Sequence, residues 1–197
     1  MEIRERILEG FKRLAFERGF HATTVDELSS RTGISKRTIY KYYRSKNELV
    51  MAVAENLMSS AERGVDSVLA SPVGPVEKMA AVISILSEHL RNINPVLMND
   101  MQKYFPNVWE RIETFRAKKV RRIIEKLMSG ENSEHFKDVI PEVFMTSLLS
   151  SVRDVLNPGF MVKNNLRPED AALCLFEIFL YGIVSDKARS EQSTLLK

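Results

Sequence analysis

Cysteine is nearly absent from this 197-residue chain, which holds a single one, Cys174. One cysteine excludes an internal disulfide framework and suits a reducing cytoplasm. Because Cys174 lies in an apolar run, we expect a buried, inert thiol rather than a redox sensor. The chain also lacks any stretch of 18 apolar residues, and its charged start, Met1 to Arg6, does not resemble a signal peptide. We therefore expect a cytoplasmic protein with no membrane partner.

Residues that carry catalysis or bind metals are equally scarce. The three histidines, His21, His89 and His135, lie far apart, and no metal-ligand spacing surrounds any of them. No Walker motif, GxGxxG or GxSxG occurs, and no pair of carboxylates stands out from ordinary surface charge. We expect neither an enzyme nor a bound cofactor or metal.

Positive charge is concentrated near the N-terminus. Residues 1–50 hold 11 lysines and arginines against 7 aspartates and glutamates, whereas the remainder holds 18 against 19. A basic end on a neutral body is expected of a protein that binds DNA through that end.

The segment from Thr24 to Glu48 predicts a helix-turn-helix. Thr24 and Glu27 have the spacing of a capping box, so a helix should begin at Val25. Gly33 can adopt the left-handed conformation of a tight turn. Ser35 should cap the second helix, and a further capping box, Ser45 with Glu48, should open another helix.

The outward face of the second helix has the chemistry of a DNA-binding surface. From Leu28 to Asn47 there are six lysines or arginines and no acidic residue. Phosphates attract such a surface, and hydroxyls add uncharged donors to phosphate oxygens. Arg37, on the first turn, carries the forked donor that can pair with guanine in the major groove. The alternative is a solvated basic face on an ordinary helical hairpin, which the caps and turn in register disfavour.

At these residues, from Gly19 to Val50, the chain resembles the TetR family of bacterial transcriptional regulators. The resemblance implies a three-helix DNA-binding head, here residues 1–47, and a helical body for dimerisation and effector binding, residues 48–197. It also implies that Lys36, Arg37 and Thr38 face DNA bases. The expected phosphate contacts are Thr24, Ser35, Tyr40, Lys41, Tyr42 and Lys46. Tyr42 and Tyr43 depart from the His and Phe common in the family, so backbone contacts can differ in detail.

The hydrophobic pattern predicts an all-α protein of nine helices with no strand. Apolar residues recur at helical spacing from Ile3 to Arg18 and through the body. Besides the two helices of the motif, the expected body helices are Lys46–Ala70, Val76–Arg91, Val96–Tyr104, Val108–Met128, Pro141–Leu156 and Glu169–Ala188. Residues 129–134 and 157–167 should be connections, and residues 189–197 a frayed tail.

Flexible methionines and aromatic residues of the middle helices suggest an effector pocket. Plain core is the competing interpretation, and the family resemblance favours the pocket. The proposed lining is Met58, Ile83, Leu86, Leu90, Met101, Phe105, Trp109 and Ile112. Because charge is scarce among these residues, we expect an apolar or aromatic molecule, whose identity the sequence does not give.

The last helix is apolar around most of its circumference, which predicts a homodimer. Such a helix must be covered on all sides, and a partner subunit is the simplest cover. The expected interface is Leu148, Val152, Leu175, Phe176, Phe179, Gly182 and Ile183. Full burial within one subunit is the alternative.

Together these features predict a TetR-like transcriptional regulator in the bacterial cytoplasm, associated with the nucleoid. A homodimer, typically a repressor in this family, would bind a palindromic double-stranded DNA operator and release it on binding a small effector. The alternative is a DNA-bound scaffold of the same fold that acts through a protein partner without small-molecule control.

Overall fold

The computed structural model describes residues 2–91, 93, 95–128 and 137–183, and regular structure within these ranges is entirely helical. The ten helices are α1 (Ile3–Arg18), α2 (Val25–Thr32), α3 (Lys36–Tyr42), α4 (Lys46–Ala70), α5 (Pro75–Leu90), α6 (Pro95–Tyr104), α7 (Pro106–Met128), α8 (Pro141–Val155), α9 (Pro158–Lys163) and α10 (Pro168–Ile183). The all-α fold is therefore confirmed, with one helix more than predicted.

The additional helix, α9, lies in the segment that was expected to be a turn-rich connection. Its first residue is Pro158, and the side chain of Asn157 accepts a hydrogen bond from the backbone N–H of Gly159 at 2.9 Å. Proline at the first position and asparagine before it are strong helix-start signals. A helix of six residues is too short for its hydrophobic spacing to predict it.

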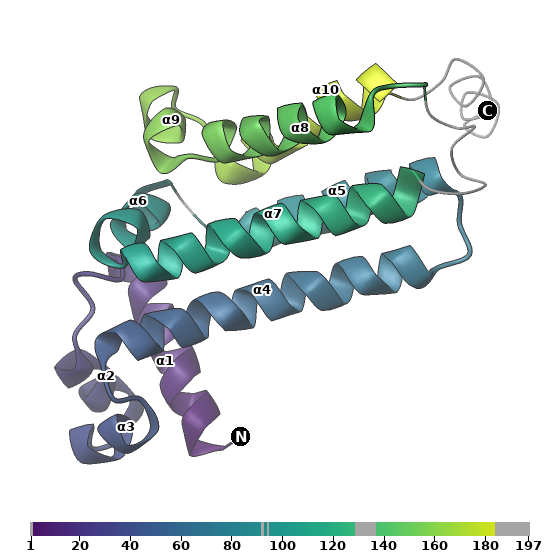
Figure 1. Ribbon diagram of the computed structural model, residues 1–197. Helices are drawn as coiled ribbons and strands as arrows, with labels where there is room; N and C mark the ends of the chain where they lie inside the picture. The colour runs from purple at the N-terminus through teal and green to yellow at the C-terminus, as the bar shows by residue number, and fades with distance from the viewer. Residues whose placement is uncertain (1, 92, 94, 129–136, 184–197) are drawn as a thin grey trace.

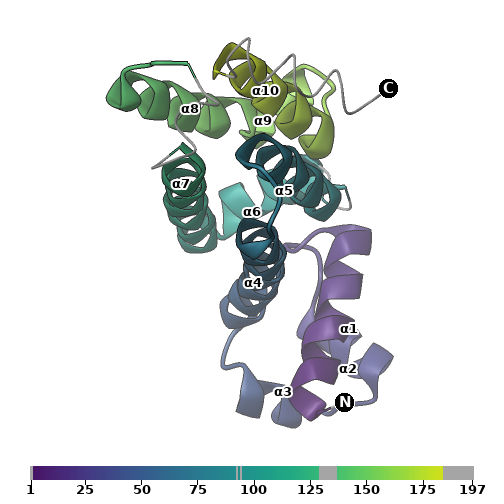
Figure 2. The ribbon, with the colours of Figure 1, turned by 90° about the vertical axis from the view of Figure 1, so that its right-hand side faces the viewer.

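The helices form a small head and a layered body (Figures 1 and 2). Helices α1, α2 and α3 surround the start of the long α4, and α8, α9 and α10 form a layer at the opposite side of the molecule. Helices α5 and α7 lie between α4 and this layer, so α4 connects the head to the layer that α5 and α7 form.

The ends of the head helices follow the predicted capping signals. Thr24 and Glu27 form the capping box of α2, and Gly33 ends that helix with a left-handed φ of 68°. The hydroxyls of Ser35 and Ser45 accept the backbone N–H of Thr38 and Glu48, which caps α3 and α4. These caps fix the turn between α2 and α3, and hence the direction in which α3 points.

Two apolar clusters make up the core. The first holds the buried residues of α1, α2 and α3 together with the first turns of α4, and it extends into α6 and α7 through Leu97, Met101, Phe105 and Val108. The ring of Phe105 meets that of Phe20 edge-on at 6.5 Å. The second cluster fills the body between α4, α5, α7, α8 and α10. The head is therefore completed by residues from the middle of the chain.

Helix α10 uses only part of its surface within the subunit. It packs against α5 and α8, while Leu173, Cys174 and Ile178 are exposed. The prediction of a buried thiol is therefore wrong, because the apolar run around Cys174 has a face that none of the described residues covers.

Three predicted features lie outside the described residues. They are the loop at residues 129–134, the end of the last helix at residues 184–188 and the tail at residues 189–197. Within the part of the chain that the structure describes, no helix is both long and apolar enough to cross a membrane.

Candidate nucleic-acid interface and interior cavity

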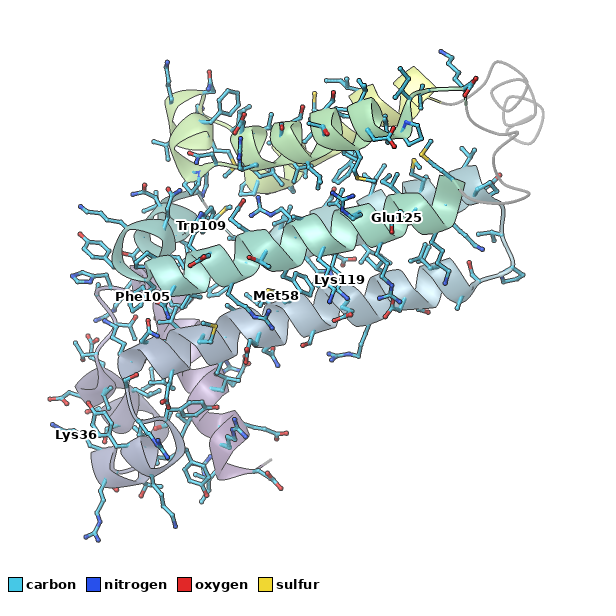
Figure 3. All side chains as sticks on the ribbon, viewed as in Figure 1. Lys36, Met58, Phe105, Trp109, Lys119 and Glu125 are labelled. Carbon is cyan, nitrogen blue, oxygen red and sulfur yellow. The ribbon has the colours of Figure 1, made fainter. Side chains whose placement is uncertain are left out.

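Helix α3 presents its polar residues at the end of the molecule most distant from α8 to α10 (Figure 3). Ile39 is fully buried under this helix, which turns the opposite face to solvent. Arg37 is exposed there. The neighbouring Lys36 is also exposed and forms an ion pair with Asp26 of α2 at 2.7 Å. Of the two predicted base-facing cations, Arg37 is thus the one without an ion pair among the described residues.

The predicted hydroxyl contacts are held by the caps. Thr24 binds Glu27, and the hydroxyls of Ser35 and Thr38 lie 2.9 Å apart. Thr24 and Ser35 remain exposed, and Thr38 is half-buried. Their positions at helix N-termini, where backbone N–H groups face outward, suit the binding of phosphate oxygens.

The other residues of α3 that were predicted to contact phosphate are all exposed to solvent. Tyr40 and Tyr42 are 48% and 40% exposed, and Lys41 between them is exposed as well. Tyr43, in contrast, is buried beneath Arg4, whose guanidinium lies 5.7 Å from the ring centroid. The aromatic pair therefore divides into one outward and one inward residue, as the helical period requires.

Lys46 lies in a different environment from the other predicted phosphate contacts. Its ammonium donates a hydrogen bond to the backbone carbonyl of His21 and lies 5.9 Å from the ring centroid of Phe105. Burial lowers the pKa of Lys46, and the nearby carboxylates of Asp100 and Glu27 partly oppose that shift. Lys46 thus holds the junction between head and body, and its contact with phosphate stays a prediction.

Two ion pairs lock α1 onto α2 and so position α3. Arg31 donates two hydrogen bonds to the carboxylate of Glu17, at 2.7 and 2.9 Å. Arg18 pairs with Glu27 at 2.5 Å. The hydrogen bond from Arg31 lowers the pKa of Glu17, and hydrogen bonds from Thr24 lower that of Glu27. Both carboxylates are therefore stabilised in the ionised form that holds the head together.

A cavity of about 210 Å³ lies in the body beside α4. Residues of α4, α5, α6 and α7 form most of its wall, with further residues from α8 and α10. Figure 3 shows Met58 and Lys119 in the space between α4 and α7. A largely apolar cavity with a few polar groups is the usual form of a small-molecule site.

Six of the eight predicted pocket residues line this cavity: Met58, Leu86, Leu90, Met101, Trp109 and Ile112. Ile83 instead lines a separate space of about 30 Å³ beneath α8 and α10. Phe105 is 7% exposed and packs in the core of the head. Ile83 is outside the wall because α5 has two apolar faces, which the sequence does not distinguish. Phe105 lies between α6 and α7, where its ring turns to Phe20 of the head.

The sequence did not indicate the charged part of the wall. Glu62 and Asp66 of α4 and Arg116, Lys119 and Arg122 of α7 all line the cavity. Lys119 pairs with Glu62, and Arg122 pairs with Asp66 at 3.1 Å. In the sequence, most of these charged residues lie three or four positions from apolar residues of the wall. This spacing was the signal that could have placed them beside the cavity. The wall therefore includes charged residues that the predicted lining did not name.

Helix α6 touches both the cavity and the head. Met98 and Met101 line the cavity, whereas Asp100 accepts the backbone N–H of His21 at 2.6 Å. The ring of Tyr104 stacks on that of His21 with a centroid distance of 3.8 Å. The α1–α2 connection is thus fastened to α6 by a contact that we call the His21 clasp, formed by His21, Asp100 and Tyr104.

The residues predicted to form the dimer interface mostly face inward. Leu148, Val152 and Leu175 are 1%, 2% and 6% exposed, so their own subunit already covers them. Phe176 and Phe179 are half-buried, and Phe179 meets Phe144 edge-on at 5.7 Å. Gly182 is exposed with open space beside it, and the side chain of Ile183 lies outside the described residues. Their exposed neighbours include Val143 at 60% and Ile178 at 64%.

Among the described residues, no group of three or more histidines, cysteines, aspartates or glutamates is placed to hold a metal ion. The polar groups of the site lie instead on the exposed surface of α3 and in the cavity wall. The first arrangement suits a polyanion, and the second suits a small molecule.

Comparison with known proteins places the head in a defined family. The family model described as "Bacterial regulatory proteins, tetR family" matches residues 7–53, which span α1 to the first turns of α4. An uncharacterized HTH-type transcriptional regulator of Bacillus subtilis, YvaF, is 26% identical over 186 residues and covers 93% of this chain and 96% of its own length. Its similarity therefore extends through the body.

Solved structures show the same fold over nearly the whole chain. A transcriptional regulator from Cytophaga hutchinsonii has a TM-score of 0.70 and 21% identity, covering 92% of this chain and 98% of its own. SmeT, the repressor of the multidrug efflux pump SmeDEF of Stenotrophomonas maltophilia, has a TM-score of 0.69 and 16% identity, covering 95% and 93%. Head and body are thus arranged as in both regulators.

Proposed function

Because the chain belongs to the TetR family of DNA-binding transcriptional regulators, we propose that it is an effector-released repressor that binds a palindromic operator as a homodimer. One observation carries this proposal: α4 runs from beneath the exposed recognition surface of α3 to the wall of the interior cavity. The description of SmeT as a repressor supports the sign of regulation. A regulator of this kind acts in the cytoplasm, at the nucleoid.

Two heads are required to read a palindrome, which makes dimerisation part of the function. Half-sites lie about 34–36 Å apart when two recognition helices enter successive major grooves on one face of the DNA. The exposed apolar residues of α8 and α10, Val143, Leu173 and Ile178, lie on the side of the molecule opposite the heads. A dimer joined there would leave both α3 helices free to face DNA.

The cavity and the His21 clasp together provide a route from effector to head. A molecule in the cavity touches Met98 and Met101, which lie on the helix that also carries Asp100 and Tyr104. Displacing α6 or α4 would move the α1–α2 connection and change the spacing of the heads. An effector shifts the equilibrium only if it binds the two spacings with different affinity, and operator DNA must weaken effector binding by the same factor. The cavity favours this mechanism over a scaffold that acts without a small molecule.

Selection of genomic DNA fragments by the purified full-length protein tests the proposal. We expect recovery of a fragment with an inverted repeat whose half-sites are about one helical turn apart. Arg37→Ala should lose this enrichment, whereas Arg153→Ala, an equal change of charge on α8, should keep it. Recovery of fragments without a shared sequence would contradict the proposal of a specific operator.

A further inference from the structure

The charges that line the cavity do not balance. Among the described residues of the wall, Arg116, Lys119 and Arg122 are cationic, whereas Glu62 and Asp66 are anionic. Both carboxylates are already engaged, Glu62 by Lys119 and Asp66 by Arg122. The wall therefore has one cation, Arg116, without a carboxylate partner that also faces the cavity.

Arg116 is held in a largely apolar setting. Its side chain is 18% exposed, and its guanidinium carbon lies 5.8 Å from the ring centroid of Trp109, another residue of the wall. Burial lowers the pKa of Arg116, while the charge of Glu113 opposes that shift. An arginine keeps its proton even when its pKa falls, so Arg116 stays cationic in its ion pair with Glu113.

The hydrogen bonds of Arg116 are incomplete. Its Nη2 atom lies 3.2 Å from Oε1 of Glu113, one turn earlier on α7. Its Nη1 atom is buried and has no hydrogen-bond partner among the described residues, and Oε1 of Glu113 also lacks a hydrogen bond. A buried donor without an acceptor is unfavourable.

We propose that the cavity takes an amphipathic acid, with an apolar body among Leu86, Leu90 and Met98 and an anionic group that accepts hydrogen bonds from Arg116. This inference rests on the proposed function, because it names the chemical class of the effector. The forked guanidinium suits a planar carboxylate, and hydrogen bonds between charged partners are stronger than neutral ones. The ion pairs of Glu62 and Asp66 with Lys119 and Arg122 keep those carboxylates from repelling the ligand.

The volume of the cavity limits the size of this acid. A cavity of 150 Å³ is large enough for benzene. The cavity here, at about 210 Å³, therefore suits a benzene ring with a short acidic chain, or an aliphatic acid of similar size. Trp109 and Phe115 in the wall offer aromatic contacts to such a ring.

Two probes that differ only in charge test the proposal on the full-length protein. Isothermal titration calorimetry should show 3-phenylpropanoate binding to the wild-type protein about tenfold more tightly than 3-phenylpropan-1-ol. Arg116→Met should abolish this preference while still binding the alcohol. Arg111→Met removes an exposed arginine of the same helix and should keep the preference. Arg116→Lys, which keeps the charge but loses the fork, should lie in between.

Each other outcome overturns the inference. Equal or tighter binding of the alcohol by the wild-type protein would show that the cavity does not select an acid, and this comparison needs no variant to fold. An acid preference that survives in Arg116→Met would place the anion elsewhere. Failure of both probes to bind at millimolar concentration would also reject it. Selection of genomic fragments by the same preparation tests the DNA-binding proposal separately.

Discussion

At the scale of single residues, Arg37 is the side chain of α3 best suited to reading a base. It is exposed on the first turn of the helix, while the neighbouring Lys36 is drawn toward Asp26. A guanidinium in the major groove can donate two hydrogen bonds to one guanine. We expect lysine and tyrosine on the same surface to contact phosphate, which would position the head without selecting a sequence.

We expect Arg37→Ala to cost roughly 1–3 kcal/mol of operator binding and to relax the preference at one position in each half-site. Competition binding against operators substituted at single positions measures both effects. Arg153→Ala, at the far side of the molecule, is the control for a change of net charge. Equal weakening on every DNA sequence would reduce Arg37 to a phosphate contact.

Glu17 gives the head a dependence on pH. Its hydrogen bonds to Arg31 lower its pKa below the ordinary value of 4.5. The stabilisation is therefore fully present above about pH 4.5 and is lost as the pH falls through the lowered pKa of the folded state. We expect Glu17→Gln to unfold at lower urea concentration than the wild type at pH 7, and the gap to close toward pH 3. Glu55→Gln, which alters an exposed carboxylate of α4, should unfold at the same urea concentration as the wild type at both pH values. A gap that stays constant down to pH 3 would show that Glu17 does not act through its charge.

At the scale of elements, α6 is the link between cavity and head. The hydrogen bond from the His21 N–H to Asp100 joins positions 79 apart in the chain. Because this bond is exposed to water, its loss should cost less than that of a buried charged hydrogen bond, about 1 kcal/mol.

We expect Asp100→Ala to lower the free energy of unfolding by about that amount and to speed hydrogen exchange at the His21 amide. Denaturation in urea and hydrogen exchange followed by mass spectrometry give the two readouts. Asn99→Ala, on the exposed side of the same helix, is the matched control. Unchanged exchange at His21 in Asp100→Ala would show that the clasp does not hold the α1–α2 connection.

The helices that the sequence predicted well are those with strong local signals. The caps at Thr24, Ser35 and Ser45 predicted where the helices of the head begin, because each cap depends on two residues only three positions apart. The neighbours of each helix depend on contacts distant in sequence, and no local pattern records them. For this reason Phe105 and Ile83 were assigned to the wrong apolar space, and the charged wall around Arg116 was missed.

At the scale of the whole molecule, the exposed apolar faces of α8 and α10 are the surfaces through which we propose that two subunits meet. Ile178 is 64% exposed on the outer face of α10, whereas Phe179 is turned inward against Phe144. A charge at position 179 would therefore disturb the subunit itself. A charge at position 178 would leave the packing within the subunit intact and would act on the proposed interface.

We expect Ile178→Glu to give a folded monomer with poor operator binding, because a carboxylate buried without a partner is costly. Sedimentation velocity measures the assembly, and circular dichroism verifies the fold. Val96→Glu, an equally exposed apolar position on α6, should remain dimeric. A normal dimer with Ile178→Glu would place the interface elsewhere.

The core that α6 and α7 share with the head has a consequence for recombination between regulators. Leu97, Met101, Phe105 and Val108 complete the packing beneath α1, α2 and α3. In a chimera joined after residue 47, the residues that pack beneath the head would come from another protein. The contact between Phe105 and Phe20 would be replaced by one that does not fit. We expect functional hybrids only where these four residues come from the same parent protein as the head. New operator specificity in such proteins is therefore more readily reached by changing exposed residues of α3 than by exchanging heads.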